Sequence, residues 1–105
     1  MYRIVKANEG TIRKIADNKT ANNLITKDIS SLVSLSTTEA TDYCEKETTD
    51  YSRIYYVLEG SLELTFDGLP HELTEGDSCY MDAGTEYEMR GTFKVVVVNQ
   101  PAFGT

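Results

Sequence analysis

Apolar and polar residues alternate along residues 62–66, where Leu, Leu and Phe are separated by Glu and Thr. A two-residue period of this kind predicts a β-strand with one buried face and one exposed face. Asp67-Gly68 follows directly and is a strong signal for a two-residue hairpin turn. The pattern therefore predicts a hairpin whose second strand begins near residue 69.

Four further segments are rich in residues that favour strands. They are residues 32–36, 43–49, 52–58 and 93–98, and the last contains a run of valines that suits a strand buried on both faces. Together with the hairpin and the segments between, they predict about seven or eight strands. Residues 11–17 are the one stretch predicted as a helix, because Ile12, Ile15 and Ala16 would share a face.

Glycines recur at intervals of seven or eight residues in the second half of the chain. They are Gly60, Gly68, Gly76, Gly84 and Gly91. This spacing predicts short strands joined by tight turns, and hence a single all-β domain, a sandwich or barrel. Closure into a barrel would also remove exposed sheet edges. We place the barrel at residues 31–105 and expect residues 1–30, a strand plus a short helix or turn, to pack on it.

The composition is that of an ordinary globular domain, with 40% apolar and 26% charged residues. No apolar run approaches the ~20 residues of a membrane-spanning helix, and no signal-peptide core follows Met1, so we expect a cytoplasmic protein without a membrane partner. Cys44 and Cys79 are too few for a disulfide framework and have no nearby Cys or His at metal-ligand spacing. They are predicted to be reduced thiols.

The net charge of −7 is unevenly distributed. Residues 1–30 carry six basic and three acidic side chains, and the rest of the chain carries four basic and fourteen acidic ones. An acidic body argues against a nucleic-acid partner. We expect the basic side chains to be solvated or to face an acidic neighbouring subunit, and we expect a homodimer. The basic residues of this segment are Arg3, Lys6, Arg13, Lys14, Lys19 and Lys27.

The acidic residues between positions 39 and 50 are predicted to form a solvated strand face. Glu45 and Glu47 share strand parity, so they could bind a hard cation weakly.

Residues 47–103 resemble the cupin family. The likeness is carried by the sequence Ile-Tyr-Tyr-Val-Leu-Glu-Gly-Ser-Leu-Glu-Leu at 54–64, by Gly76-Asp77 and by Ala83-Gly84. It implies an all-β fold, the cupin double-stranded β-helix or jelly-roll barrel, in a single domain.

Cupins hold a metal ion through two motifs, and this sequence departs from both. The first motif supplies His-x-His and a Glu, whose places are taken here by Glu47, Thr49 and Arg53. The second motif supplies a His, whose place is taken by Tyr87. Thr and Tyr are poor neutral ligands, and Arg53 puts a permanent positive charge where a divalent cation would lie. We therefore predict no metal ion and no other cofactor.

A narrower likeness, over residues 51–60 and 84–88, is to cupins of the ethanolamine-utilisation type, which also lack the histidine pair.

Strand alternation predicts which side chains enter the pocket. If Arg53 points inward, Tyr51 and Tyr55 do so as well, and Tyr87 meets them from the second motif. A guanidinium offers paired donors to a carboxylate or phosphate, and aromatic rings stack on sugars. The predicted ligand-binding residues are Glu47, Thr49, Arg53, Tyr55 and Tyr87.

Three functions are consistent with these residues. The preferred one is metal-independent binding of a small polar or anionic metabolite. The second is a metal-independent enzyme, similar to sugar isomerases and epimerases or to ethanolamine-utilisation cupins, in which Tyr87 or Glu47 moves a proton. The third is a structural or interaction barrel filled by its own side chains, for example by an ion pair between Arg53 and Glu47 or Glu45. An open cavity would exclude the third.

Overall fold

Three long strands of fifteen residues each form the centre of a single antiparallel sheet. They are β3 (Ser34–Thr48), β4 (Ser52–Phe66) and β7 (Glu86–Gln100), and the computed structural model describes all residues from 1 to 105. Strand β7 lies between β3 and β4 and pairs with both along almost its whole length. The segments predicted separately at residues 32–36 and 43–49 therefore belong largely to one continuous strand.

Shorter strands extend this centre on both sides. Strands β1 (Thr11–Ala16) and β2 (Lys19–Ile25) add to β3, whereas β5 (Leu69–Thr74) and β6 (Ser78–Met81) each pair with β4. A 3-10 turn, η1 (Ala7–Glu9), precedes β1. No helix in the structure is long and apolar enough to cross a lipid bilayer.

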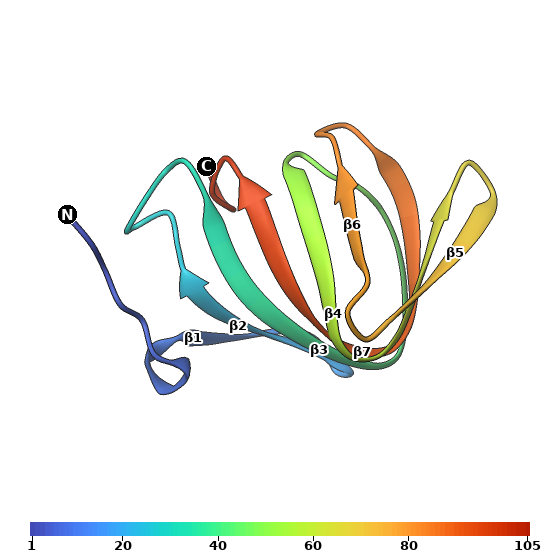
Figure 1. Ribbon diagram of the computed structural model, residues 1–105, viewed down its shortest axis with the longest axis horizontal. Helices are drawn as coiled ribbons and strands as arrows, with labels where there is room; N and C mark the ends of the chain where they lie inside the picture. Colours follow the sequence, from blue (N-terminus) through green and yellow to red (C-terminus); the bar gives the residue numbers. More distant parts are fainter.

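The pairing registers divide the sheet into two facing layers. The first half of β4 pairs with β6 and with the second half of β7, which continues through the first half of β3 to β2 and β1. The second half of β4 pairs with β5 and with the first half of β7, beside the second half of β3. Figure 1 shows the long strands curving from one layer into the other. This is the jelly-roll arrangement, and the all-β prediction is confirmed.

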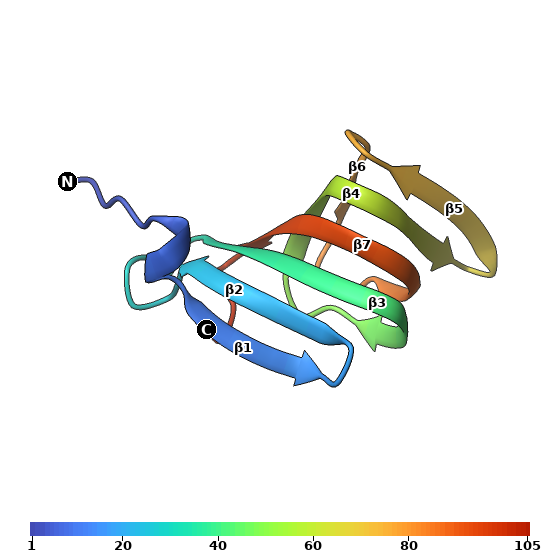
Figure 2. The ribbon, with the colours of Figure 1, turned by 90° about the horizontal axis from the view of Figure 1, so that it is seen from below.

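The sheet is not closed into a full barrel. The strand order begins at β1 and ends at β5, and these two strands do not pair with each other (Figure 2). The expectation that barrel closure removes the sheet edges is therefore wrong within a single chain, because β1 and β5 remain as edge strands.

The bend between the layers depends on two glycines inside strands. Gly60 lies opposite Phe93, and Gly91 lies opposite Leu62 on the neighbouring strand. Both have positive φ, and a Cβ on either would lie 2.2 Å from a carbonyl oxygen of the other strand. The turn predicted at Gly91 is therefore wrong, since this glycine permits a sharp bend and close backbone contact within β7.

The helix predicted at residues 11–17 is also wrong, because Thr11–Ala16 is strand β1. It pairs with β2 across the two-residue connection Asp17-Asn18. Six residues are too few for a stable isolated helix, so pairing with β2 decides the conformation. The predicted turn at Asp67-Gly68 is confirmed, with positive φ at both residues as a type I′ hairpin requires.

Candidate functional site

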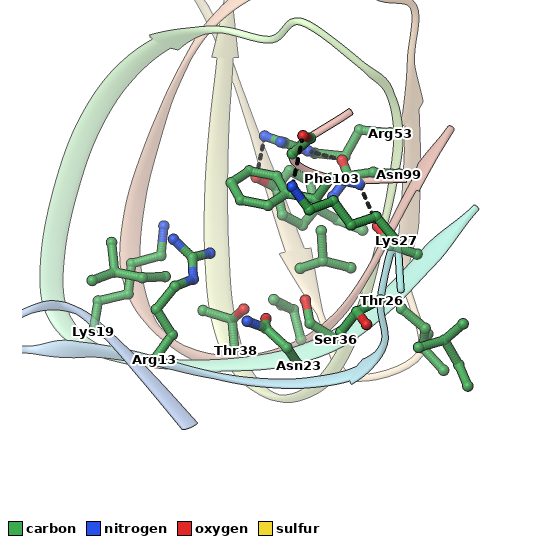
Figure 3. Close-up of a pocket in the computed structure, with 18 of the residues that line it drawn as sticks. Arg13, Lys19, Asn23, Thr26, Lys27, Ser36, Thr38, Arg53, Asn99 and Phe103 are labelled. Atoms are coloured by element: carbon green, nitrogen blue, oxygen red, sulfur yellow. Dashed lines mark hydrogen bonds between the residues drawn. The ribbon is translucent and has the colours of Figure 1, made fainter. Parts of the chain in front are cut away.

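A cavity of about 450 Å³ lies on the concave inner side of the sheet. Its wall comes from β1, β2, β3, β4 and β7, and its rim includes Phe103 and Gly104 from the C-terminal tail. Figure 3 shows its polar lining, with Arg53 and Asn99 on one side and Thr38, Asn23 and Ser36 on the other. The cavity exists beside a formed Arg53–Glu47 ion pair, so the pocket is not filled by its own side chains.

Strand alternation places Arg53 inside the cavity, as predicted. Arg53, Tyr55 and Val57 are buried, whereas Ile54 and Tyr56 between them are exposed on the outer face. Only 6% of Arg53 is exposed, so its charge needs partners within the protein.

The partners of Arg53 form what we call the Arg53 cluster, which consists of Arg53, Glu47, Tyr55, Tyr87 and Asn99. Arg53 Nη1 donates to Glu47 Oε1 at 3.0 Å and to the Tyr87 hydroxyl at 2.8 Å, and Nε donates to Asn99 Oδ1 at 2.7 Å. The Tyr87 hydroxyl donates to Glu47 Oε2 at 3.0 Å and lies 2.7 Å from the Tyr55 hydroxyl. Glu47, Arg53 and Tyr87 therefore converge, as their motif positions predicted.

Electrostatics keep this cluster in one protonation state. Burial acts to lower the pKa of Arg53, but Tyr55, Tyr87 and Glu47 outweigh it and hold that pKa above its usual value. Burial raises the pKa of Tyr87 and of Tyr55 above the ordinary phenol value. Arg53 is thus a permanent cation, and the two phenols stay protonated at physiological pH.

Not every donor of Arg53 is used within the protein. Its Nη2 makes no hydrogen bond to another residue, although Nε and Nη1 do. Asn22 Oδ1 is the only side-chain polar atom that is both sealed from solvent and without a partner. Arg53 Nη2 is therefore reachable from the cavity and is available to an oxyanion.

Two other predicted binding residues lie outside the cavity lining. Tyr87 is 2% exposed and lies behind Arg53 and Tyr55, and Thr49 is 1% exposed with its hydroxyl bonded to the backbone of Tyr51. Tyr51 does not line the cavity either, because its ring lies beside Phe103 and its hydroxyl accepts from the Gly104 backbone N–H at 2.8 Å.

Lys19 is a site residue that sequence reasoning missed. It was expected on a solvated surface but is 8% exposed and lines the cavity. Its Nζ lies 3.6 Å from Glu45 Oε2, 3.5 Å from Met89 Sδ and 4.6 Å from the centre of the Tyr43 ring. Burial lowers the pKa of Lys19, although the nearby charges of Glu45 and Glu47 act in the opposite direction. Arg13 and Lys27, from the same basic segment, also line the cavity.

Glu45 and Glu47 both line the cavity. This corrects the solvated acidic face predicted for Glu45, whereas Glu47 was also predicted to be a pocket residue. Burial favours the neutral acid of Glu45, but the Tyr43 hydroxyl that donates to it and the charge of Lys19 lower its pKa overall. Each carboxylate thus already has a cationic partner, Lys19 for Glu45 and Arg53 for Glu47. This arrangement does not favour even a weakly bound hard cation.

The lining also contains polar residues without protein partners, and the sequence had not singled them out. Asn23 pairs with Ser36 in register, and Thr38 lies one inward position further along β3. Their side chains make no hydrogen bond to the protein, and we call these three residues the polar wall. The Asp17-Asn18 turn could have identified the β1–β2 hairpin, but not the pairing of β2 with β3 that brings Lys19 and Asn23 to the cavity.

The sequence profile of the cupin domain matches residues 37–99, more than half of the chain. The chain belongs to the cupin family.

Solved cupin structures are similar in fold. KdgF from Halomonas sp. superposes with a TM-score of 0.85 at 12% identity, over 99% of this chain and 97% of that one. The polyketide cyclase RemF from Streptomyces resistomycificus superposes with a TM-score of 0.81 at 19% sequence identity, over 95% of this chain and 80% of RemF.

The EutQ protein of Clostridium difficile gives a TM-score of 0.75 at 21% identity, over 81% of this chain and 64% of EutQ. This chain therefore spans less than two thirds of EutQ. The predicted likeness to ethanolamine-utilisation cupins is confirmed for the fold. A search of curated protein sequences finds no significant match.

The residues at the metal position of this cupin do not fit a divalent ion. Arg53 occupies the place of a ligand with a cationic group, and both oxygens of Glu47 already accept hydrogen bonds from Arg53 and Tyr87. No group of three or more His, Cys, Asp or Glu side chains is arranged to hold a metal ion. A guanidinium repels a cation and carries no lone pair that could bind it, so these residues do not form a metal site.

Proposed function

We propose that this cupin binds a small anionic metabolite in its cavity without a metal ion. One observation carries the proposal: an open cavity of about 450 Å³ is reached by an unpaired guanidinium nitrogen of Arg53. That volume lies within the ~300–1,000 Å³ typical of ligand pockets. The lining holds four cationic and three acidic side chains, whereas the whole chain carries a net charge of −7. Positive charge is thus concentrated where a ligand would bind.

The test is calorimetric titration and thermal shift with carboxylates, phosphates and matched neutral compounds. An anionic ligand should raise the melting temperature, because binding to the folded state alone stabilises it, and higher salt should weaken its binding. Arg13→Gln should weaken binding about tenfold, the equivalent of one charge-assisted contact of about 1.4 kcal/mol.

Lys14→Gln is the matched control, since Lys14 is the next residue of β1, is exposed and lies outside the cavity lining. Binding by neutral compounds only, or an equal effect of the two substitutions, would contradict the proposal.

A metal-independent enzyme is the second candidate, and the position of Glu47 favours it. Glu47 lines the cavity and is hydrogen-bonded to the Tyr87 phenol, whereas Tyr87 itself does not reach the lining. Proton transfer to a bound sugar would therefore fall to Glu47, with Tyr87 positioning it. In that case Glu47→Gln should abolish turnover of the bound compound, followed by NMR, under conditions in which circular dichroism shows the variant to be folded, although loss of the ion pair with Arg53 lowers its melting temperature.

We also infer a homodimer formed through the outer face of the sheet. Cross-strand pairing aligns Leu35, Val98, Ile54 and Tyr80 in one row on that face, and Ile54 and Tyr80 are 41% and 61% exposed. The N-terminal segment, which leads away from the sheet in Figure 1, exposes Tyr2 as well. Unpartnered apolar surface of this kind marks protein interfaces.

A second copy fits the outer face because the basic residues of the N-terminal segment that lie outside the cavity, Arg3, Lys6 and Lys14, complement the acidic remainder of the chain. Sedimentation or light scattering should report a dimer that Ile54→Glu converts to a monomer. A wild-type monomer at high concentration would contradict this assignment.

A further inference from the structure

The cavity wall is divided into a polar half and an apolar half. Cross-strand register places the inward side chains in rows that run from β2 to β4. One row is Asn23, Ser36, Val97 and Tyr55, and the next is Ala21, Thr38, Val95 and Val57. The β2–β3 side of these rows supplies the polar wall, and the β7–β4 side supplies aliphatic carbon and the Tyr55 ring.

The polar wall consists of one buried residue, Thr38, and two half-buried ones, Asn23 and Ser36, and none of their side chains is hydrogen-bonded to the protein. Thr38 is 5% exposed, and its hydroxyl makes no hydrogen bond to the protein. The side chains of Asn23 and Ser36 beside it are also without protein partners, and all three line the cavity. Water can satisfy these groups in the free protein. A ligand that displaces the water must then offer its own donors and acceptors to avoid leaving them unpaired.

One cationic group lies across the cavity from the polar wall, and two lie at one end of it. In Figure 3, Arg53 is opposite Asn23 and Ser36, while Lys19 and Arg13 lie at the end near Thr38. The Nη2 of Arg53 is free, and Lys19 Nζ has only one carboxylate contact, at 3.6 Å. A ligand that spans the cavity thus meets hydrogen-bonding groups along one edge and a positive charge at another.

We propose that the ligand is a polyhydroxylated anion of sugar size, a sugar acid or a sugar phosphate. This inference rests on the proposed function, because it names the class of anion that the same cavity binds. The hydroxyl groups of the ligand bind the polar wall, its C–H face packs on Val95, Val97 and the Tyr55 ring, and its anionic group binds Arg53. A sugar ring carries hydroxyl groups at its edge and C–H groups on its face, which matches the polar side and the apolar side of the cavity.

Four probes separate the parts of this recognition in calorimetric titrations of the whole chain. Glucuronate and glucose 6-phosphate carry both hydroxyl groups and an anionic group, glucose lacks the anionic group, and glutarate lacks the hydroxyl groups. Glucuronate or glucose 6-phosphate should bind at least tenfold more tightly than glutarate and glucose. The stronger of the two identifies carboxylate or phosphate as the anionic source.

Thr38→Val and Ser36→Ala test the polar wall directly. Thr38→Val keeps the shape of the side chain and removes only the hydroxyl, so the protein should fold with an unchanged melting temperature. Each substitution should weaken binding of the preferred sugar anion about fivefold to tenfold, the effect of one lost hydrogen bond, and leave glutarate binding unchanged. Thr37→Val is the matched control, because Thr37 is the preceding residue of β3 and pairs with Val96 and not with the inward Val95.

The outcomes separate this inference from the proposed function. Equal affinity for glutarate and the sugar anions, or unchanged sugar-anion binding by both polar-wall variants, overturns the polyhydroxylated ligand and leaves anion binding intact. Tighter binding of glucose than of either sugar anion, or no binding of any of the four compounds, overturns both.

Discussion

The Arg53 cluster and the polar wall lie at the same cavity, but they differ in hydrogen bonding. The polar groups of the cluster bind one another, whereas those of the wall bind no other part of the protein. In the cluster, Arg53, Glu47 and Tyr87 bind one another at 2.8 to 3.0 Å. In the polar wall, Asn23, Ser36 and Thr38 have no protein partner. The difference indicates that the cluster fixes the position of one charge, whereas the wall is left to interact with whatever occupies the cavity.

The largest effect is expected from Arg53→Met. This substitution removes the central cation, leaves Glu47 without its ion-pair partner and leaves Asn99 Oδ1 without its donor. Breaking a buried ion pair costs about 3–5 kcal/mol, and the loss here should be near the lower end because the Glu47 side chain is 29% exposed. Urea unfolding monitored by circular dichroism measures it. A loss below about 1 kcal/mol would show that the cluster does not stabilise the fold.

A smaller loss is expected from Tyr87→Phe. The phenylalanine keeps the ring packing against Tyr55 and Phe66 and removes only the hydroxyl shared with Arg53 and Glu47. The free energy of unfolding should fall by about 1–2 kcal/mol, because buried partners lose a hydrogen bond. Tyr80→Phe provides the control, since its hydroxyl binds only Asp82 at the surface. Equal effects of the two substitutions would contradict a special role for the cluster.

Glu45→Gln should change the dependence of stability on acid. The folded pKa of Glu45 lies below its usual value of 4.5, so its carboxylate contributes stability above about pH 4.5 that is lost as the pH falls through the folded pKa. The Gln variant should therefore lose less stability on acidification than the wild type. Urea unfolding at pH 7 and in steps below pH 4.5 measures the difference. Glu72→Gln, on exposed β5, is the control and should follow the wild type.

The smallest effect on stability is expected from Thr38→Val, within about 0.5 kcal/mol of the wild type. An unpartnered hydroxyl contributes no hydrogen bond to the folded protein, and valine has nearly the same shape. Thermal unfolding of Thr38→Val and Tyr87→Phe, both without ligand, compares the loss of an unpartnered hydroxyl with the loss of a hydroxyl that is hydrogen-bonded to its neighbours. A loss as large as that of Tyr87→Phe would show that the polar wall has a structural role.

Strand alternation and the spacing of the family motifs together predicted Arg53, Tyr55, Glu47 and Tyr87 of the Arg53 cluster, but not Asn99. The two-residue period of β4 places Arg53 and Tyr55 on one face, and the family motif spacing brings Glu47 and Tyr87 to it. The all-β fold follows from the same alternation and from turns such as Asp67-Gly68.

The remainder of the cavity depends on which strands become neighbours. Thr38, Asn23 and Lys19 are ordinary strand residues until β2 pairs with β3, and no short-range pattern specifies that pairing. Lys19 was expected in solvent because its charge favours water, yet Glu45, from a strand more than twenty residues away, compensates its burial. The bend at Gly91 was mistaken for a turn because a glycine at a strand bend and one in a hairpin look alike in sequence.

The close backbone contacts at Gly60 and at Gly91 have a consequence for how such a cavity can diversify. The bend that carries β4 and β7 from one layer to the other depends on backbone atoms of the two paired strands that approach closely at these positions, away from the cavity lining. The glycines at the bend therefore determine the shape of the cavity, and the inward-facing side chains determine which chemical groups line it. Substitutions along the inward rows can alter ligand preference while the curvature persists. A side chain at either glycine would instead push β4 and β7 apart at the bend and reshape the cavity with every lining residue unchanged.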